Sequence, residues 1–129
     1  MRNTLIVLIG SGLGGALRHL CNVFVTSVTG TSFPWGILAI NVVGSSLMGM
    51  VVGWWALNGS ASQELRLFLT TGIIGGFTTF STFSLDTVLL VERGNAGLAA
   101  TYVAASVVLS LLGLLLGMWL TQLGITSLR

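Results

Sequence analysis

The chain has 129 residues, of which 53% are hydrophobic and only 6% are charged, and its mean hydropathy is +0.99. Soluble domains carry about 25% charged residues, so this composition excludes a folded water-soluble protein and predicts an all-α integral membrane protein whose partner is the lipid bilayer. Its positive charges are five scattered arginines without a cluster, which argues against a nucleic-acid partner.

Four apolar spans follow one another along the chain, each close to the ~20 residues that a helix needs to cross a bilayer. Short polar loops separate them, as is usual in helix bundles. We therefore expect residues 1–129 to form a single four-helix transmembrane domain. The predicted spans are residues 4–25, 35–57, 65–91 and 97–123.

The first span loosely resembles a signal peptide but lacks a small-residue cleavage site, and further spans follow it, so we expect a retained helix. Arg18 lies about two-thirds of the way along this span and is predicted to reach the membrane interface by extending its side chain. His19 is expected to be interfacial, and the single Cys21 to be a packing residue.

Asn41 is the only amide in the second span. In hydrocarbon it needs hydrogen-bond partners, so it either joins two helices or lines a pathway as a donor. The sequence leaves both interpretations open.

The third span contains the segment GGFTTFSTFS, residues 75–84, in which glycines precede threonines. Both residue types weaken a helix, and lipid tolerates a broken helix only where the break is buried in protein or lines a cavity. We therefore predict a broken third helix whose freed carbonyls are able to bind a hard cation.

Phenylalanines recur every third residue in the same segment, at Phe77, Phe80 and Phe83. Such residues usually face lipid or the core, but here hydroxyl side chains alternate with them. A benzene ring has a positive edge, so ring edges and hydroxyls together are able to bind an anion without a fixed charge. Asp86 follows about five residues before the end of the span, where a water-filled vestibule suffices to solvate it.

The fourth span carries Tyr102, Ser106 and Ser110 at intervals of four, which places them on one helix face. This polar stripe is compatible with helix packing and with an aqueous track.

Glycine pairs spaced by four recur in all four spans and predict close helix–helix packing. Aromatic belts are indicated by tryptophans near the span ends. The glycine pairs are Gly10/Gly14, Gly49/Gly53, Gly72/Gly76 and Gly113/Gly117, and the tryptophans are Trp35, Trp54, Trp55 and Trp119.

The orientation signal is weak. Arg2, Arg66 and Arg129 lie on one side of the membrane, against Arg93 and, if it reaches that interface, Arg18. A chain with so small a bias is able to insert both ways, and two copies in opposite orientations are then able to pair.

Taken together, these motifs resemble the Fluc (CrcB) family of small fluoride channels over nearly the whole chain. The resemblance rests on four elements in order: the glycine-rich residues 12–18, the asparagine motif at 41–44, TTGIIGGFTTFSTFS at 70–84, and the Tyr102/Ser106/Ser110 stripe. The third element is the most specific.

The resemblance implies a dual-topology, antiparallel homodimer in the cell inner (plasma) membrane, with fluoride passing through two pores and resistance to fluoride as the physiological role. Phe80 and Phe83 would contact fluoride through their ring edges, and Arg18 would attract anions at the vestibule. The backbone carbonyls of Gly75 and Thr78, from both subunits, would hold a structural Na⁺. The polar track would consist of Asn41, Thr79, Ser81, Thr82, Tyr102, Ser106 and Ser110.

Three positions depart from the family pattern. Ile37 and Leu114 stand where threonine is expected, and Asp86 stands where glutamate is usual. The two missing hydroxyls bring parts of the polar track into question.

A proton-coupled small multidrug exporter is the alternative, because such exporters are also four-helix antiparallel dimers. They need a buried carboxylate, which the first span lacks, and Asp86 is off-centre. A non-transporting scaffold would fit the glycines but would leave the hydroxyl-rich segment unexplained. We expect no enzyme, because the sequence contains no activated nucleophile, paired carboxylates or metal-ligand cluster.

Overall fold

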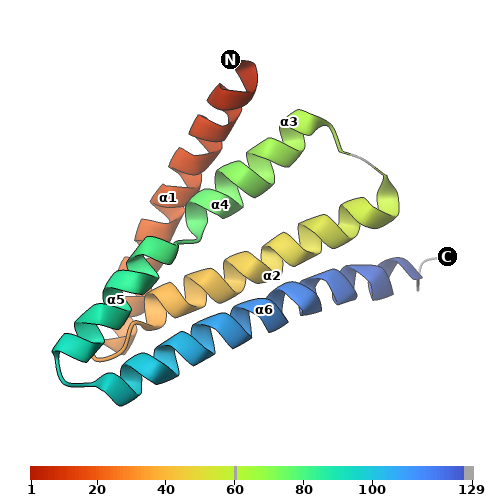
Figure 1. Ribbon diagram of the computed structural model, residues 1–129. Helices are drawn as coiled ribbons and strands as arrows, with labels where there is room; N and C mark the ends of the chain where they lie inside the picture. The colour runs from red at the N-terminus through yellow and green to blue at the C-terminus, as the bar shows by residue number, and fades with distance from the viewer. Residues whose placement is uncertain (60, 127–129) are drawn as a thin grey trace.

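The computed structural model describes residues 1–59 and 61–126, so Arg129, which entered the orientation argument, lies outside the described residues. All regular structure in this part of the chain is helical, and it forms four rods (Figure 1). The segments are α1 (Arg2–Thr29), α2 (Trp35–Asn58), α3 (Gln63–Arg66), η1 (Leu67–Ile74), α4 (Gly75–Phe77), α5 (Phe80–Glu92) and α6 (Ala96–Thr126).

The four predicted spans are confirmed as four helical rods, each long and apolar enough to cross a membrane. The third rod is the composite of α3, η1, α4 and α5. The first helix runs a turn beyond its predicted end and stops before Gly30, whose φ of 79° lies in the left-handed region that glycine adopts without strain.

The predicted break in the third rod is confirmed, and it lies at the two threonines that follow the glycines. Gly75 and Gly76 are helical, whereas Thr78 (φ −76°, ψ 158°) and Thr79 (φ −153°, ψ 121°) are extended. The segment before the break, η1, is a π-helix of eight residues, which the sequence did not predict. π-helical turns are rare and occur frequently near functional sites.

All four glycine pairs lie at close contacts between rods, as predicted. A Cβ added to Gly10 would lie 2.8 Å from the Cα of Gly72, and one added to Gly76 would lie 2.8 Å from the Cα of Ser11. These contacts hold η1 and α4 against α1. The other two pairs bring α2 and α6 together, where Gly49 faces the carbonyl of Leu114.

The two pairs of rods diverge from one another, with α1 and the α3–α4 segment on one side and α2 and α6 on the other (Figure 1). Side chains of α2, α5 and α6 meet in one buried cluster, at the end where α2 and α6 begin. The cluster comprises Ile37, Leu38, Ile40, Phe83, Leu90, Ala99 and Tyr102.

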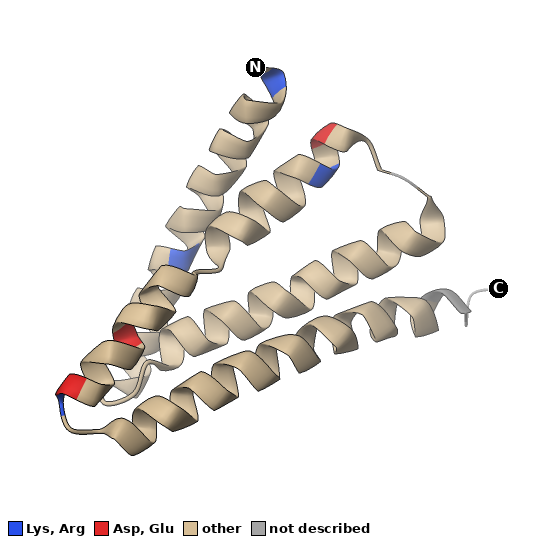
Figure 2. Ribbon diagram, in the orientation of Figure 1, with Lys and Arg blue, Asp and Glu red and all other residues tan. Residues whose placement is uncertain are grey.

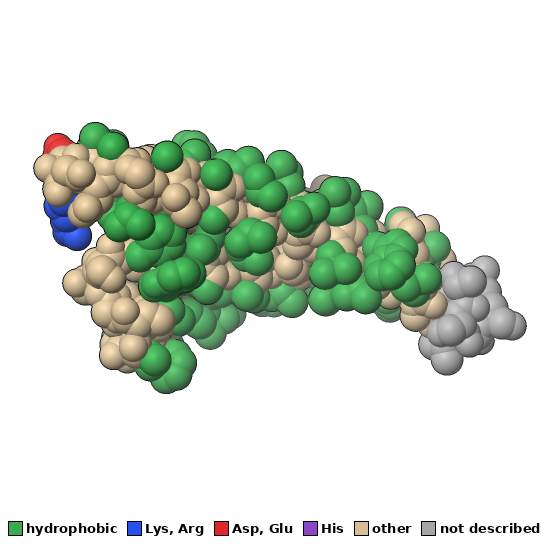
Figure 3. Space-filling model, turned by 90° about the horizontal axis from the view of Figure 1, so that it is seen from below, with side chains coloured by type: hydrophobic (Ala, Val, Ile, Leu, Met, Phe, Trp, Pro, Cys, Tyr) green, Lys and Arg blue, Asp and Glu red, His purple; other side chains and the backbone are tan. Residues whose placement is uncertain are grey.

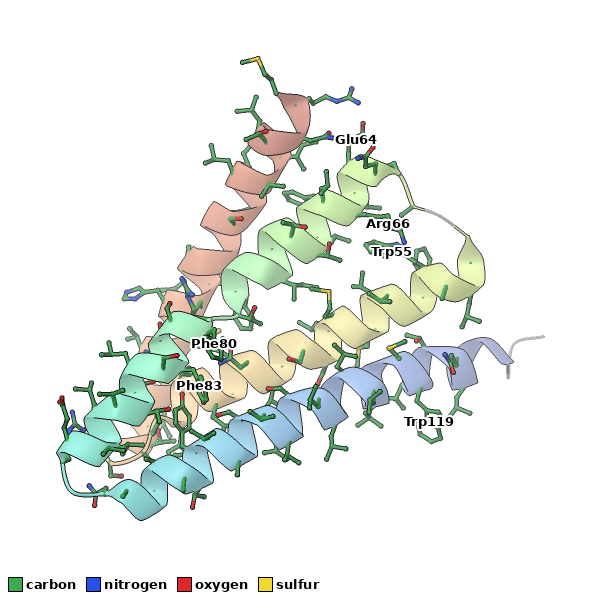
Figure 4. All side chains as sticks on the ribbon, in the orientation of Figure 1. Trp55, Glu64, Arg66, Phe80, Phe83 and Trp119 are labelled. Carbon is green, nitrogen blue, oxygen red and sulfur yellow. The ribbon has the colours of Figure 1, made fainter. Side chains whose placement is uncertain are left out.

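Elsewhere the rods expose apolar side chains, as the surface in Figure 3 shows. Charged residues gather mainly near the ends of the rods (Figure 2). Three of the tryptophans are about half exposed, as a membrane-interface belt requires, but Trp55 is buried at 6% and lies beneath Arg66, 5.2 Å from its guanidinium carbon (Figure 4). Trp55 thus lies near the end of α2, as predicted, but its ring packs inside the protein and does not face outward.

Candidate functional site

Asn41 of α2 holds the break in the third rod by two hydrogen bonds to Thr79. Its Nδ2 donates to the Thr79 carbonyl at 3.1 Å, and its Oδ1 accepts from the Thr79 N–H at 2.9 Å. That N–H would bond the carbonyl of Gly75 if the helix were continuous. Asn41 thus joins two helices and also borders the open space at the break. The two roles that the sequence left open, joining helices and lining a pathway, are therefore compatible in this one side chain.

The hydroxyls that follow the break form a local network. Thr79 Oγ1 accepts a hydrogen bond from the N–H of Thr82 at 3.3 Å, which makes Thr79 the N-cap of α5. The same atom lies 3.1 Å from Thr82 Oγ1 and 3.3 Å from Ser81 Oγ. Serines and threonines here therefore replace the bonds that an unbroken helix would make.

A cavity of about 480 Å³ opens beside the break, and we call it the break cavity. It gathers eight of the residues that the sequence singled out: Asn41, Gly75, Thr78, Thr79, Phe80, Phe83, Ser106 and Ser110. Ser45, Val107 and Leu111 complete its lining.

Ser106 is buried in the wall of this cavity, and its hydroxyl has no hydrogen-bond partner among the residues that the structure describes. Buried hydroxyls are nearly always hydrogen-bonded, so the arrangement calls for an acceptor in the cavity.

The two phenylalanines expected to bind an anion lie side by side on α5, with ring centroids 5.4 Å apart and planes inclined by 47° (Figure 4). Phe83 is buried, whereas Phe80 is 79% exposed. Phe83 also lies 5.2 Å from the ring of Tyr102, which has no exposed surface.

Arg18 does not extend to an interface as the sequence predicted. Its Nη1 lies 3.4 Å from the carbonyl oxygen of Thr78, so the guanidinium of α1 points at the break. The carbonyls exposed by the break explain this, because they offer a half-buried cation an acceptor within the span.

Tyr102 donates a long hydrogen bond to Asp86 Oδ2, at 3.5 Å, and does not line the break cavity. Asp86 lies in a second cavity of about 200 Å³, which we call the end cavity, together with Thr82, Arg93 and Asn22. The sequence predicted solvent access for Asp86 but missed Asn22, although an amide in an apolar span was the signal that identified Asn41.

Comparison with known proteins identifies the family that the chain matches. The model of the family described as CrcB-like protein, Camphor Resistance (CrcB), matches residues 5–118. The chain is 52% identical over 120 residues to the fluoride-specific ion channel FluC 2 of Nitrobacter hamburgensis, covering 93% of this chain and 97% of that protein. It is 55% identical over 113 residues to the fluoride-specific ion channel FluC of Methylobacterium nodulans, covering 88% and 90%. The fluoride-specific ion channel FluC of Granulibacter bethesdensis is 53% identical over 122 residues, covering 95% and 96%.

Proposed function

Because the chain belongs to the CrcB family, we propose that it is a fluoride-selective ion channel that lets fluoride leave the cell passively and thereby confers fluoride resistance. It is a channel and not an enzyme. Relatives that are about half identical over nearly their whole length carry the name of fluoride-specific channel. The observation in this molecule that carries the proposal is the break cavity, where the Ser106 hydroxyl, which has no partner among the described residues, faces the same space as Phe80 and Phe83.

Fluoride is small and strongly hydrated, so a pore must replace its water with many good donors. Within the break cavity these are neutral: the Ser106 and Ser110 hydroxyls, the Asn41 amide and the ring edges of Phe80 and Phe83. Neutral donors stabilise the anion without trapping it, and conduction requires binding weak enough for release. The hydroxyls of Thr79, Ser81 and Thr82 continue the track along α5, and Tyr102 borders it.

A second copy in antiparallel orientation would complete the site. The 79% exposure of Phe80 beside a polar cavity supports this, because one chain leaves half of its ring pair uncovered. The divergent rods expose apolar faces that a second copy would bury. The weak arginine bias supports insertion in both orientations. We place this dual-topology homodimer in the inner (plasma) membrane as a multi-pass protein.

The backbone at the break fits a structural Na⁺ between the two copies. Thr79 gives its N–H to Asn41, which leaves the Gly75 carbonyl without its regular helical donor. Among the described residues, the Thr78 carbonyl accepts only the long bond from Arg18. Carbonyl oxygens suit a hard cation. When bound, the ion would fix the two broken helices and offset the negative potential of their carbonyls. Arg18 at this point would add positive potential that attracts anions.

Efflux from liposomes containing the purified protein tests the function, with fluoride and chloride electrodes read in parallel. We expect fast fluoride loss, negligible chloride loss and no flux from Phe80→Ile. Phe24→Ile is the matched control, because Phe24 is also exposed but lies on α1, away from the cavity. Absence of fluoride flux from folded wild-type protein would contradict the proposal, and equal flux of both anions would contradict donor-based selectivity.

The proton-coupled drug exporter is not favoured. It needs a central exchangeable carboxylate, whereas Asp86 lies in the end cavity and is bonded to Tyr102.

A further inference from the structure

We propose that the end cavity is an anion-binding antechamber of the channel and that Arg93 recruits the anion there. The inference rests on the proposed function and adds a subsite to it. The end cavity lies where α1 ends and α5 approaches the loop before α6. Its polar lining consists of Asn22, Thr26, Thr31, Thr82, Asp86 and Arg93.

Among the arginines within the described residues, Arg93 is the one whose charge is free to act in this way. Arg2 pairs with Glu64, Arg66 lies over Trp55, and Arg18 bonds the Thr78 carbonyl. Within residues 1–59 and 61–126, the Arg93 guanidinium makes no hydrogen bond or salt bridge. It is exposed at the turn after α5 and borders the cavity, so it faces both water and the enclosed space.

Asn22 supplies a second donor. Its side chain packs directly on Gly36 of α2, so it is fixed by a close contact that a larger residue at position 36 would prevent. In the described part of the chain its amide, like the Arg93 guanidinium, has no hydrogen-bond acceptor. Two open donors, one of them charged, in a cavity of about 200 Å³ suit a small anion with part of its water shell.

The end cavity adjoins the break cavity through α5. Thr82 lines the end cavity and Thr79 lines the break cavity, and their hydroxyl oxygens are 3.1 Å apart. Phe83 lines the break cavity and its ring lies 5.2 Å from that of Tyr102, whose hydroxyl donates to Asp86 in the end cavity. An anion that leaves the break cavity along the hydroxyls therefore reaches the end cavity next.

Asp86 makes the charge of Arg93 necessary there. A carboxylate in a small cavity repels an approaching anion, and partial exclusion of water strengthens the repulsion. Arg93 on the same cavity offsets that charge. With Arg93 the cavity is neutral overall, and without it the cavity is negative and would oppose anion entry.

The test compares fluoride efflux from liposomes at low fluoride concentration, in low salt and in high salt, with potassium sulfate as the added salt. We expect Arg93→Gln to slow flux about threefold to tenfold in low salt and the deficit to shrink in high salt, because surface attraction is screened. Arg93→Glu should be slower still, and Arg93→Lys should restore most of the wild-type rate. Arg66→Gln is the control, because it removes the same charge from a residue that stacks on Trp55.

Asp86→Asn separates recruitment from a structural ion pair. Recruitment predicts opposite signs: Asp86→Asn raises low-salt flux, and in the double variant it recovers part of what Arg93→Gln loses. Equal losses of flux in both single variants, with no further loss in the double variant, would show that the two residues act only as a structural ion pair. That result would overturn the inference. A fluoride flux of Arg93→Gln equal to that of Arg66→Gln would also overturn the inference. Either result leaves fluoride flux in the wild type intact, whereas a silent wild type would overturn the proposed function itself.

Discussion

The two halves of the third rod are held in different ways. Before the break, η1 and α4 lie against α1 with backbone touching backbone, at glycines where no side chain intervenes. After the break, α5 is held by side chains, through the Asn41 bonds to Thr79 and the Phe83–Tyr102 ring contact. The first half is therefore a rigid support, and the second half carries the groups that face the cavities. Substitutions in the two halves should fail differently, the first in folding and the second mainly in flux.

The largest expected effect is on the support. In Gly14→Ala the new methyl group would overlap the carbonyl oxygen of Ile73 and lie 2.8 Å from the backbone nitrogen of Phe77. Backbone cannot move aside as a side chain does, so we expect a loss of more than about 3 kcal/mol, at or beyond the upper end for overpacking. Unfolding in a detergent titration measures it. Gly12→Ala, with nothing within 4 Å, is the control and should be nearly neutral.

Asn41→Leu comes next, because it acts where the two halves join. The variant leaves both the N–H and the carbonyl of Thr79 without their bonds, which predicts a loss of about 2 to 4 kcal/mol. Flux should also fall, since the break loses its fixed geometry. Asn58→Ala removes an exposed amide that donates to the Trp54 carbonyl of its own helix, and it should change neither quantity. A stable, fully conducting Asn41→Leu protein would contradict the account of the break.

Ser106→Ala should separate flux from stability. Since the buried hydroxyl has no partner among the described residues, its removal should leave stability unchanged or raise it by up to about 1 kcal/mol. Fluoride flux should fall several-fold, because the cavity loses a donor. Efflux and unfolding measured on the same preparation check both. The control is Ser27→Ala, whose exposed hydroxyl bonds a carbonyl of its own helix. A destabilised variant with normal flux would contradict the assignment.

Arg2→Gln should have the smallest effect. It removes the salt bridge to Glu64 that joins α1 to α3 at the far end of the support. Exposed pairs contribute little, so we expect a loss below about 0.5 kcal/mol. A larger loss in the same unfolding titration would mean that side chains, and not only glycine contacts, hold the first half.

Much of the architecture follows from local sequence signals. Charge depletion and span length identify four helices, and the glycine spacing identifies which faces touch, because both depend on residues close together in the chain. The break follows from Gly75–Thr79, where helix-weakening residues cluster. The exact position of the break does not follow from the local sequence, because the Asn41 bonds that fix Thr79 come from another rod.

The features that sequence reasoning missed all depend on contacts between rods. The π-helical turn of η1 depends on its packing against α1. The direction of the Arg18 side chain depends on the Thr78 carbonyl, and the burial of Trp55 depends on the position of Arg66. The end cavity is lined by Asn22, Asp86 and Arg93 from distant segments, so their spacing in the sequence does not predict it. Eight of the expected residues share the break cavity because five of them lie within residues 75–83 around the break and two lie one turn apart on α6.

The extended pair at Thr78–Thr79 also changes the electrostatics within the rod, because it turns one long helix into two, with two new ends in its interior. The last carbonyls of α4 carry partial negative charge, and the first amides of α5 carry partial positive charge, equivalent to roughly half an elementary charge at the end of a long helix. The two ends lie two residues apart, so a single interruption places partial negative charge and partial positive charge on the same short stretch of backbone.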